Sequence, residues 1–191
     1  MGEVKVPLRV MGVDPGLTRC GVGVVDVAPD RSARLVHVSV VRSAPELPIA
    51  ERLHIIAQGL RAAVREFGPA VIAVERVFAQ QNRSTVMGTA QASGIALLIA
   101  AESGLPAATH TPSEVKAAIT GYGSAEKLQV QTMVARILRL DALPQPADAA
   151  DALALALCHA WRGGAPAAAD DGAALTPAQR AWRNAERSTR R

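Results

Sequence analysis

The chain has 191 residues, of which 49% are hydrophobic, 20% are charged and only 3% are aromatic. This length and composition are typical of one globular domain with a short tail. No stretch approaches the roughly 18 consecutive apolar residues of a transmembrane helix, and Glu3, Lys5 and Arg9 interrupt the N-terminal apolar residues, so we expect neither a membrane span nor a signal peptide. Cys20 and Cys158 are far apart and form no CxxC motif, which predicts a reduced, cytoplasmic protein.

The formal net charge of +4 comes from the end of the chain. Residues 1–171 contain 16 basic and 16 acidic side chains, whereas residues 172–191 contain five arginines and one glutamate. Overall charge therefore does not predict nucleic-acid binding by the main domain, and any such site must come from local clustering. Among the 21 basic residues only three are lysines, namely Lys5, Lys116 and Lys127.

Three valine-rich segments open the chain, at 6–13, 21–27 and 35–41. The turn signatures Asp14-Pro15-Gly16 and Ala28-Pro29-Asp30 separate them. Short β-branched runs between such turns predict antiparallel strands.

The pattern then changes to helical spacing over 49–67, where apolar residues recur every three or four positions until Gly68-Pro69. The apolar run 70–74 ends abruptly in Glu75, which is typical of a buried central strand. A helix over about 83–103 and a short strand at 106–110 are expected next.

Three more helices are predicted after this strand. Thr111-Pro112-Ser113-Glu114 has the pattern of a capping box with proline at the first helical position. After Gly121-Tyr122-Gly123 comes a helix whose apolar side is expected to carry Leu128, Val134, Ile137 and Leu138. Pro144 and Pro146 end that region, and Asp148 opens a last helix that reaches about Trp161.

Strands followed by alternating helices and strands predict an α/β fold, with a mixed sheet and helices on both of its faces. We expect this domain to occupy residues 1–162. Residues 163–191 are rich first in Ala, Gly and Asp and then in Arg, which predicts a flexible linker and tail.

Four carboxylates stand at the ends of predicted elements. Asp14 and Glu75 each end an apolar strand, and Asp148 and Asp151 share one face of a helix start. Singly, each has an ordinary explanation as a turn residue, an exposed side chain or a helix cap. Together they can meet at one rim of a sheet, where oxygen ligands would select a hard ion, Mg²⁺ or Mn²⁺. Two such ions about 4 Å apart would suit phosphodiester cleavage, one activating water and the other stabilising the leaving oxygen.

Two of the three lysines and the few aromatic residues near the predicted site are candidate nucleic-acid contacts. Lys116 and Lys127 flank a Gly-Tyr-Gly turn, and compact ammonium groups beside glycine backbone suit phosphate contact, although solvated surface lysines are the alternative. Phe78 follows Glu75 by three residues and is either a core residue or a side chain that stacks on unpaired bases. Tyr122 is a weaker candidate of the same kind.

Five motifs resemble those of the RuvC family of crossover junction endodeoxyribonucleases, over about residues 8–162 and in the family's order. They are Val13-Asp14-Pro15-Gly16, Val74-Glu75-Arg76-Val77-Phe78, Thr111-Pro112-Ser113-Glu114-Val115-Lys116, Gly121-Tyr122-Gly123 and Asp148-Ala149-Ala150-Asp151-Ala152. The resemblance implies a ribonuclease-H-like fold, a homodimer, and Mg²⁺-dependent resolution of Holliday junctions by paired symmetric nicks. It also implies four-way junction DNA as the substrate and the branch-migration proteins RuvA and RuvB as partners.

The same resemblance implies roles for individual residues. Two metal ions per site, with Mn²⁺ able to substitute for Mg²⁺, would be held by the four acids Asp14, Glu75, Asp148 and Asp151. Lys116 and Lys127 would lie on the phosphate side, with Lys127 also catalytic, and Phe78 would contact bases. We add Arg76, Arg83 and Tyr122, which neighbour these motifs, as further candidate DNA contacts.

Two other functions are open alternatives at this point. Asp14-Pro15-Gly16-Leu17-Thr18 also resembles the phosphate-binding hairpin of actin-like ATPases and sugar kinases. Those proteins need two related domains around a nucleotide, and this chain has the length of one and no second copy of the hairpin. A junction-binding scaffold without catalysis is the other alternative, and the complete set of four acids argues against it.

Overall fold

The computed structural model describes residues 6–77 and 83–162, with only the backbone described for 83–85. Five strands form one sheet in the order β3-β2-β1-β4-β5. β1 pairs with β2 and β2 with β3 in antiparallel fashion, whereas β4 runs parallel to β1 and to β5. Their bounds are β1 (Leu8–Asp14), β2 (Arg19–Val27), β3 (Ala33–Arg42), β4 (Val71–Glu75) and β5 (Ala107–His110). The predicted mixed sheet, with its three antiparallel N-terminal strands, is confirmed.

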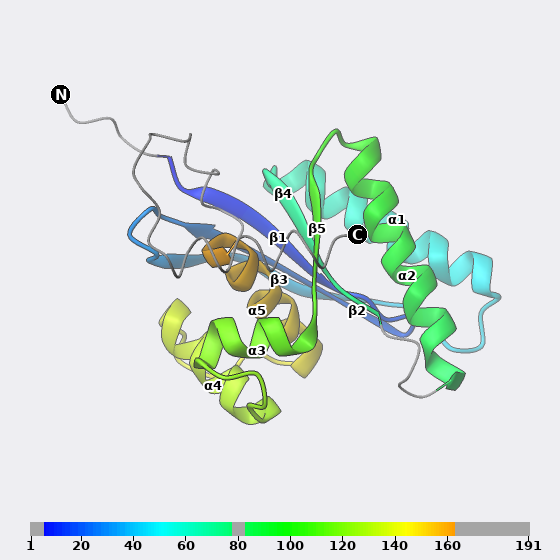
Figure 1. Cartoon of the computed structure of the whole chain (residues 1–191). Coiled ribbons are helices and arrows are strands. Elements are labelled where there is room, and N and C mark those ends of the chain that lie inside the picture. Colours follow the sequence, from blue (N-terminus) through cyan, green and yellow to red (C-terminus); the bar gives the residue numbers. More distant parts are fainter. Residues whose placement is uncertain (1–5, 78–82, 163–191) are drawn as a thin grey trace, which may run out of the picture.

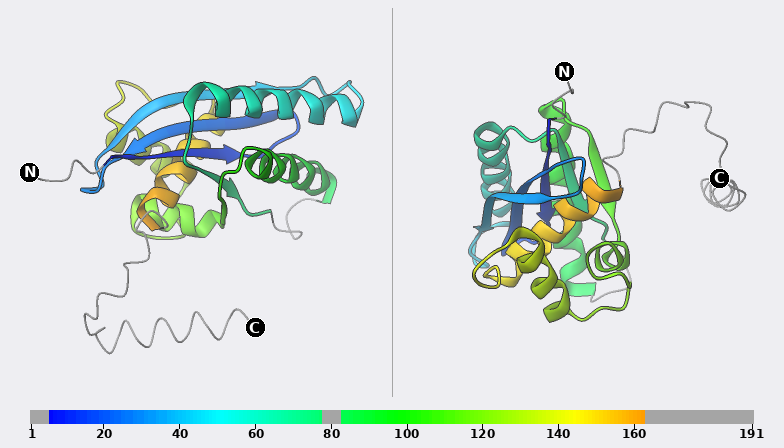
Figure 2. Two further views of the ribbon diagram at one scale, coloured as in Figure 1. Left: turned by 90° about the horizontal axis from the view of Figure 1, so that it is seen from above. Right: turned by 90° about the vertical axis from the view of Figure 1, so that its left-hand side faces the viewer.

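Five helices cover the two faces of this sheet, as the orthogonal views show (Figure 1, Figure 2). α1 and α2 lie on one face, and α3, α4 and α5 lie on the other (Figure 1). The helices are α1 (Ile49–Phe67), α2 (Arg83–Glu102), α3 (Pro112–Thr120), α4 (Lys127–Leu138) and α5 (Ala147–Arg162). Among the described residues, no helix is both long and apolar enough to cross a bilayer. The expected tail at 163–191 lies outside the described residues.

The alternation of side chains along the strands separates two hydrophobic cores. In β1, Val10 packs with α5 and its neighbours, whereas Met11 and Val13 pack with α1 and α2. All three are fully buried, as expected for a strand in the middle of a sheet that is covered on both faces. Cys20 and Cys158 are buried as free thiols, one in each core.

Glycines in the central strands bring α5 unusually close to the sheet. A Cβ atom added at Gly12 would collide with the carbonyl oxygen of Ala152, and one added at Gly21 would collide with that of Asp148. Only glycine therefore allows the helix backbone to rest directly on the backbone of β1 and β2. This contact fixes the start of α5 beside the end of β1.

The predicted capping box is confirmed, because the Thr111 side chain accepts from the Glu114 backbone N–H while the Glu114 side chain caps Thr111 in return. One expectation for α4 is wrong. Leu128 is 61% exposed, and the buried side of α4 is formed by Val130, Val134 and Leu138. Leu128 precedes Val134 by six positions, which places it about 240° around the helix from that residue.

Candidate active site

Two of the predicted acids stand side by side at one edge of the sheet. The last paired residues of the parallel strands β1 and β4 are Val13 and Val74, so Asp14 and Glu75 follow at adjacent strand ends. Neighbouring strands lie about 4.8 Å apart, and parallel strands end at the same edge. Both carboxylates are partly buried there.

α5 brings the other two acids to the same edge. Asp14 is the register partner of Gly21, and the backbone of Asp148 rests on Gly21. Asp148 lies in the first turn of α5 and Asp151 follows three positions later, so both project from one face of the helix. The structure thus brings together four carboxylates from three elements that are far apart in the sequence.

The crowding of these carboxylates changes the acidity of Asp14 and Glu75. Burial, followed by the charges of Glu75, Asp151 and Asp148, raises the pKa of Asp14 to about 8. Burial and the charge of Asp151 also raise the pKa of Glu75, against the opposing effect of nearby lysines. A carboxyl group this far from its usual pKa marks a functional-site candidate, because the cluster favours a strong counter-charge.

Two basic side chains lie against the α5 acids. Lys127, the first residue of α4, donates from Nζ to Asp151 Oδ2 over 2.7 Å. Burial alone would lower the pKa of Lys127, but the hydrogen bond and charge of Asp151 outweigh it and raise that pKa. Arg19 Nε lies 3.0 Å from Asp148 Oδ2. Its N–H is not directed at that oxygen, which is buried without a hydrogen-bond donor among the described residues.

Two hollows flank the carboxylates. One, of about 220 Å³, is lined by Glu75, Asp151, Lys116 and Lys127 together with apolar residues of α3, α4 and α5. The other, of about 430 Å³, borders Asp148 and is lined by residues 16–19, Arg52 and the first half of α2. Each hollow therefore joins the acids to basic side chains, an arrangement suited to a phosphate-bearing ligand.

The donor set fits a hard divalent cation. It consists of four carboxylates, two of which, Asp14 and Glu75, have raised pKa values, and a third, Asp148, has a buried oxygen without a hydrogen-bond donor among the described residues. Among the residues that the structure describes, no three His, Cys, Asp or Glu side chains are already arranged to hold one ion together. Lys127 and Arg19 each lie against a carboxylate oxygen of α5, on Asp151 and Asp148 respectively.

The other predicted residues are less closely tied to the carboxylates. Tyr122 is 47% exposed, and its hydroxyl donates to Gln129 Oε1 over 2.8 Å, which ties the Gly-Tyr-Gly turn to α4. Arg76 is exposed and donates from Nη2 to Thr109 Oγ1 over 3.4 Å at the end of β5. Phe78 and the side chain of Arg83 lie outside the described residues.

Sequence reasoning missed Arg19 and Arg52. Arg52 donates to the Thr18 hydroxyl over 2.8 Å and to that of Ser43 over 3.1 Å, which anchors the turn after Asp14 to α1. Neither arginine has a local sequence signature, since Arg19 meets Asp148 from the far end of the domain and Arg52 meets Thr18 across 34 positions. The glycines of β1 and β2 were a visible signal, because glycine in a strand interior often marks the close approach of another backbone.

A family model described as Crossover junction endodeoxyribonuclease RuvC matches residues 10–159. A protein of that name from Leifsonia xyli subsp. xyli is 61% identical over 196 residues, which covers 96% of this chain and 94% of the relative. Another, from Clavibacter michiganensis subsp. michiganensis, is 56% identical over 199 residues, which covers 96% of this chain and 98% of the relative.

Solved structures agree with the sequence comparisons. Thermus thermophilus RuvC is 38% identical with a TM-score of 0.76, over 82% of this chain and 96% of that one. The same protein in complex with a Holliday junction substrate gives 38% identity and a TM-score of 0.78, over 82% and 94%. The yeast mitochondrial Holliday junction resolvase Ydc2, at 13% identity and a TM-score of 0.57 over 82% and 81%, supports the fold alone. The expected ribonuclease-H-like fold class is confirmed.

Proposed function

The chain belongs to the RuvC family and is a crossover junction endodeoxyribonuclease that resolves Holliday junctions, and from this premise we propose that its four clustered acids form the catalytic metal site. The observation that carries the proposal is the convergence of Asp14, Glu75, Asp148 and Asp151 at one sheet edge, with the pKa of Asp14 raised to about 8. Carboxylates that repel each other so strongly suit a cation of high charge.

Dependence on a divalent metal is a property of this nuclease family, and we propose Mg²⁺, with two ions per site and Mn²⁺ able to substitute. Bound metal supplies Lewis-acid activation of water and stabilisation of charge on the departing oxygen. Asp14 and Glu75 would hold it from rigid strand ends, and Asp148 and Asp151 from the first two turns of α5.

The basic residues would then position the DNA strand. We propose that Lys127, which contacts Asp151, directs its ammonium toward the negative charge that grows on the scissile phosphate. Lys116 lines the same hollow and would bind a flanking phosphate. On the other side, Arg19 and Arg52 line the hollow next to Asp148, so the strand would cross the carboxylates from one basic hollow to the other.

Paired nicks require two active sites, and we propose a homodimer. α2 supports this, because it exposes apolar side chains on its outer face, with Met87 at 68%, Leu98 at 49% and Leu97 at 39% exposure. Gly94 lies on the same face with nothing within 4 Å of an added Cβ, so a second helix could approach closely. Phe78, Arg76, Arg83 and Tyr122 are proposed as DNA contacts around each site.

The wider biology follows from the family as a proposal. We propose that RuvA and RuvB deliver the junction, and that the protein acts in the cytoplasm. Residues 1–162 are proposed as the nuclease domain, and the Arg-rich residues 163–191 as an appendage that adds salt-dependent DNA affinity.

The two alternative functions are not favoured. The family model that matches residues 10–159 describes a nuclease and not an actin-like ATPase or sugar kinase. A scaffold without catalysis would have no need to keep four repelling carboxylates at one edge, where each raises the cost of burying the others.

The proposed metal site is tested by titrating Mn²⁺ into the full-length protein by calorimetry, without DNA. Asp14→Asn and Glu75→Gln should each weaken Mn²⁺ binding by about tenfold or more, because each removes an anionic ligand. The matched control is Asp141→Asn, which removes an exposed carboxylate outside the site and should bind Mn²⁺ as the wild type does. Equal Mn²⁺ affinity in all four proteins would refute the assigned metal role.

A further inference from the structure

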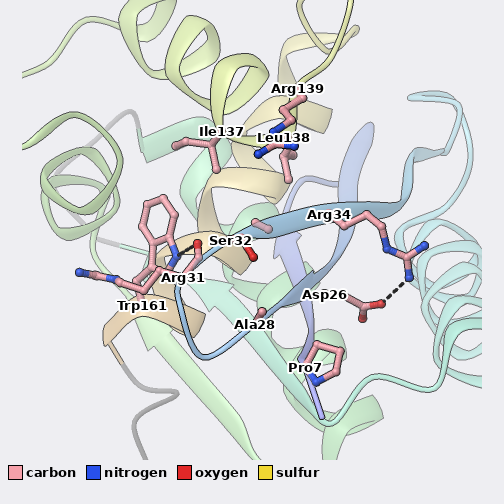
Figure 3. A pocket seen from close by; sticks show the side chains of 11 residues that line it. Pro7, Asp26, Ala28, Arg31, Ser32, Arg34, Ile137, Leu138, Arg139 and Trp161 are labelled. Atoms are coloured by element: carbon pink, nitrogen blue, oxygen red, sulfur yellow. Dashed lines mark hydrogen bonds and ion pairs between the residues drawn. The ribbon is translucent and has the colours of Figure 1, made fainter. Parts of the chain in front are cut away.

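A third hollow, of about 680 Å³, opens at the opposite edge of the sheet from the carboxylates. Pro7 borders it just before β1 begins, whereas Asp14 ends β1, so the strand of seven residues separates the two by roughly 23 Å. In the same way Trp161, near the end of α5, borders the hollow, whereas Asp148 lies in the first turn of that helix. We call this hollow the distal pocket (Figure 3).

One side of the distal pocket is apolar. Trp161, Ile137 and Leu138 line it, with Pro7 across from them (Figure 3). The Trp161 indole is held in place, because its Nε1 donates to the carbonyl oxygen of Arg31 over 3.3 Å. A fixed aromatic wall of this kind is a common anchor point for an apolar side chain of a ligand.

The rim of the distal pocket is basic. Arg34 Nη2 lies 2.9 Å from Asp26 Oδ2, and Arg9 donates to the same carboxylate over 2.7 Å, so the charge of Asp26 is fully compensated. Arg31 and Arg139 are exposed, and neither has a carboxylate partner among the described residues. The Arg31 guanidinium carbon lies 5.5 Å from the centre of the Trp161 ring, which places one cation beside the apolar wall.

Arg31 and Arg139 also share an unusual backbone conformation. Arg31 and Arg139 have φ values of 70° and 53°, and they are the only non-glycine residues with positive φ in the described part of the chain. Elsewhere this conformation is taken by Gly68, Gly104 and Gly121, as the steric preference for glycine predicts. At the two positions that face the distal pocket, a long cationic side chain stands where glycine is usual. Such exceptions cluster where a side chain has a binding role.

We propose that the distal pocket binds an acidic peptide segment of a partner protein. An apolar side chain of the peptide would pack against Trp161 and Leu138, and flanking carboxylates would pair with Arg31 and Arg139. A DNA backbone would match the arginines but would leave the apolar wall unused, so the combination of both features favours a peptide. This site is separate from the proposed catalytic edge and does not depend on it.

The test uses the full-length protein and a fluorescein-labelled peptide, Asp-Asp-Leu-Phe-Asp-Asp, with fluorescence anisotropy as the readout. The wild type should bind this peptide, and Arg31→Ala/Arg139→Ala should bind about tenfold more weakly. The matched control, Arg65→Ala/Arg136→Ala, removes two exposed arginines that do not line the pocket and should bind as the wild type does. A peptide with asparagine in place of every aspartate should bind as weakly as the pocket variant.

Five outcomes would overturn the proposal. Three are no peptide binding by the wild type, equal binding by the pocket variant, and equal binding of the asparagine peptide. The fourth is loss of junction affinity in the pocket variant but not in the control, which would make the pocket a DNA site. The fifth is tighter peptide binding after Asp170→Asn/Asp171→Asn, which would identify a segment of this chain as the occupant. Junction cleavage should be unchanged in the pocket variant, so this test and that of the catalytic site fail independently.

Discussion

Gly21→Ala should separate catalysis from folding, because this glycine holds the first turn of α5 beside Asp14. The added Cβ would lie 2.9 Å from the Asp148 carbonyl carbon and closer still to its oxygen, whereas ordinary contacts begin at 3.4 Å. The start of α5, with Asp148, must therefore move by about 1 Å, a misplacement that typically costs a catalytic site about 10²-fold in rate. Overpacking should cost about 1–2 kcal/mol of unfolding free energy after the entropic gain of replacing glycine.

The assay is kcat for junction cleavage at saturating Mg²⁺ and saturating junction, with Tm measured on the same samples. Ile99→Val is the control, since it removes a buried methyl group from the opposite core at a similar cost of about 1 kcal/mol. That control should keep the wild-type kcat. A folded Gly21→Ala protein that also cleaves at the wild-type rate would refute the idea that this contact positions Asp148.

Lys127→Ala should lower the cleavage rate by about 10²-fold with little change in Tm. An unchanged cleavage rate would show that Lys127 is an ordinary surface residue. The hydrogen bond from Arg9 holds the pKa of Asp26 below its usual value, so the stability that Asp26 contributes is full above about pH 4 and lost as pH falls through its folded pKa. Asp26→Asn should therefore lower the unfolding free energy by about 2 kcal/mol at pH 7, and the difference from wild type should shrink in acid; a constant difference would contradict the ion pair. Millimolar Mg²⁺ should raise the Tm of the wild type but not that of Asp14→Asn, as differential scanning fluorimetry would show, and equal rises would place the metal elsewhere. Leu98→Glu on the outer face of α2 should convert a dimer to a monomer in sedimentation experiments, and an unchanged mass would exclude this face as the interface.

Most elements could be predicted from local sequence because their signals are local. The change from strand to helical periodicity at 49–67 matches α1, and the capping-box pattern at Thr111 gives the start of α3. The placement of acids at element ends was also visible, since Asp14 and Glu75 follow apolar runs. The parallel pairing of β1 with β4 then explains why those two meet.

The remaining features depend on contacts between distant residues. Lys127 reaches Asp151 only because α4 packs against α5, and Arg19 meets Asp148 only because glycine at position 21 admits the helix. The burial of α4 was misjudged at Leu128 because periodicity alone does not say which stripe of a short helix faces its neighbours. The distal pocket draws residues from four elements and the turns between them, so no sequence window contains it.

The most direct test of the account is a cleavage map of a synthetic mobile four-way junction, with a linear duplex as control, in Mg²⁺ and in EDTA. Wild-type protein should nick opposing strands of the junction symmetrically in Mg²⁺ only. Asp14→Asn should bind the junction with near wild-type affinity yet leave it intact. Cleavage by Asp14→Asn, or cleavage by the wild type in EDTA, would contradict the central claim that the carboxylate cluster is a catalytic metal site.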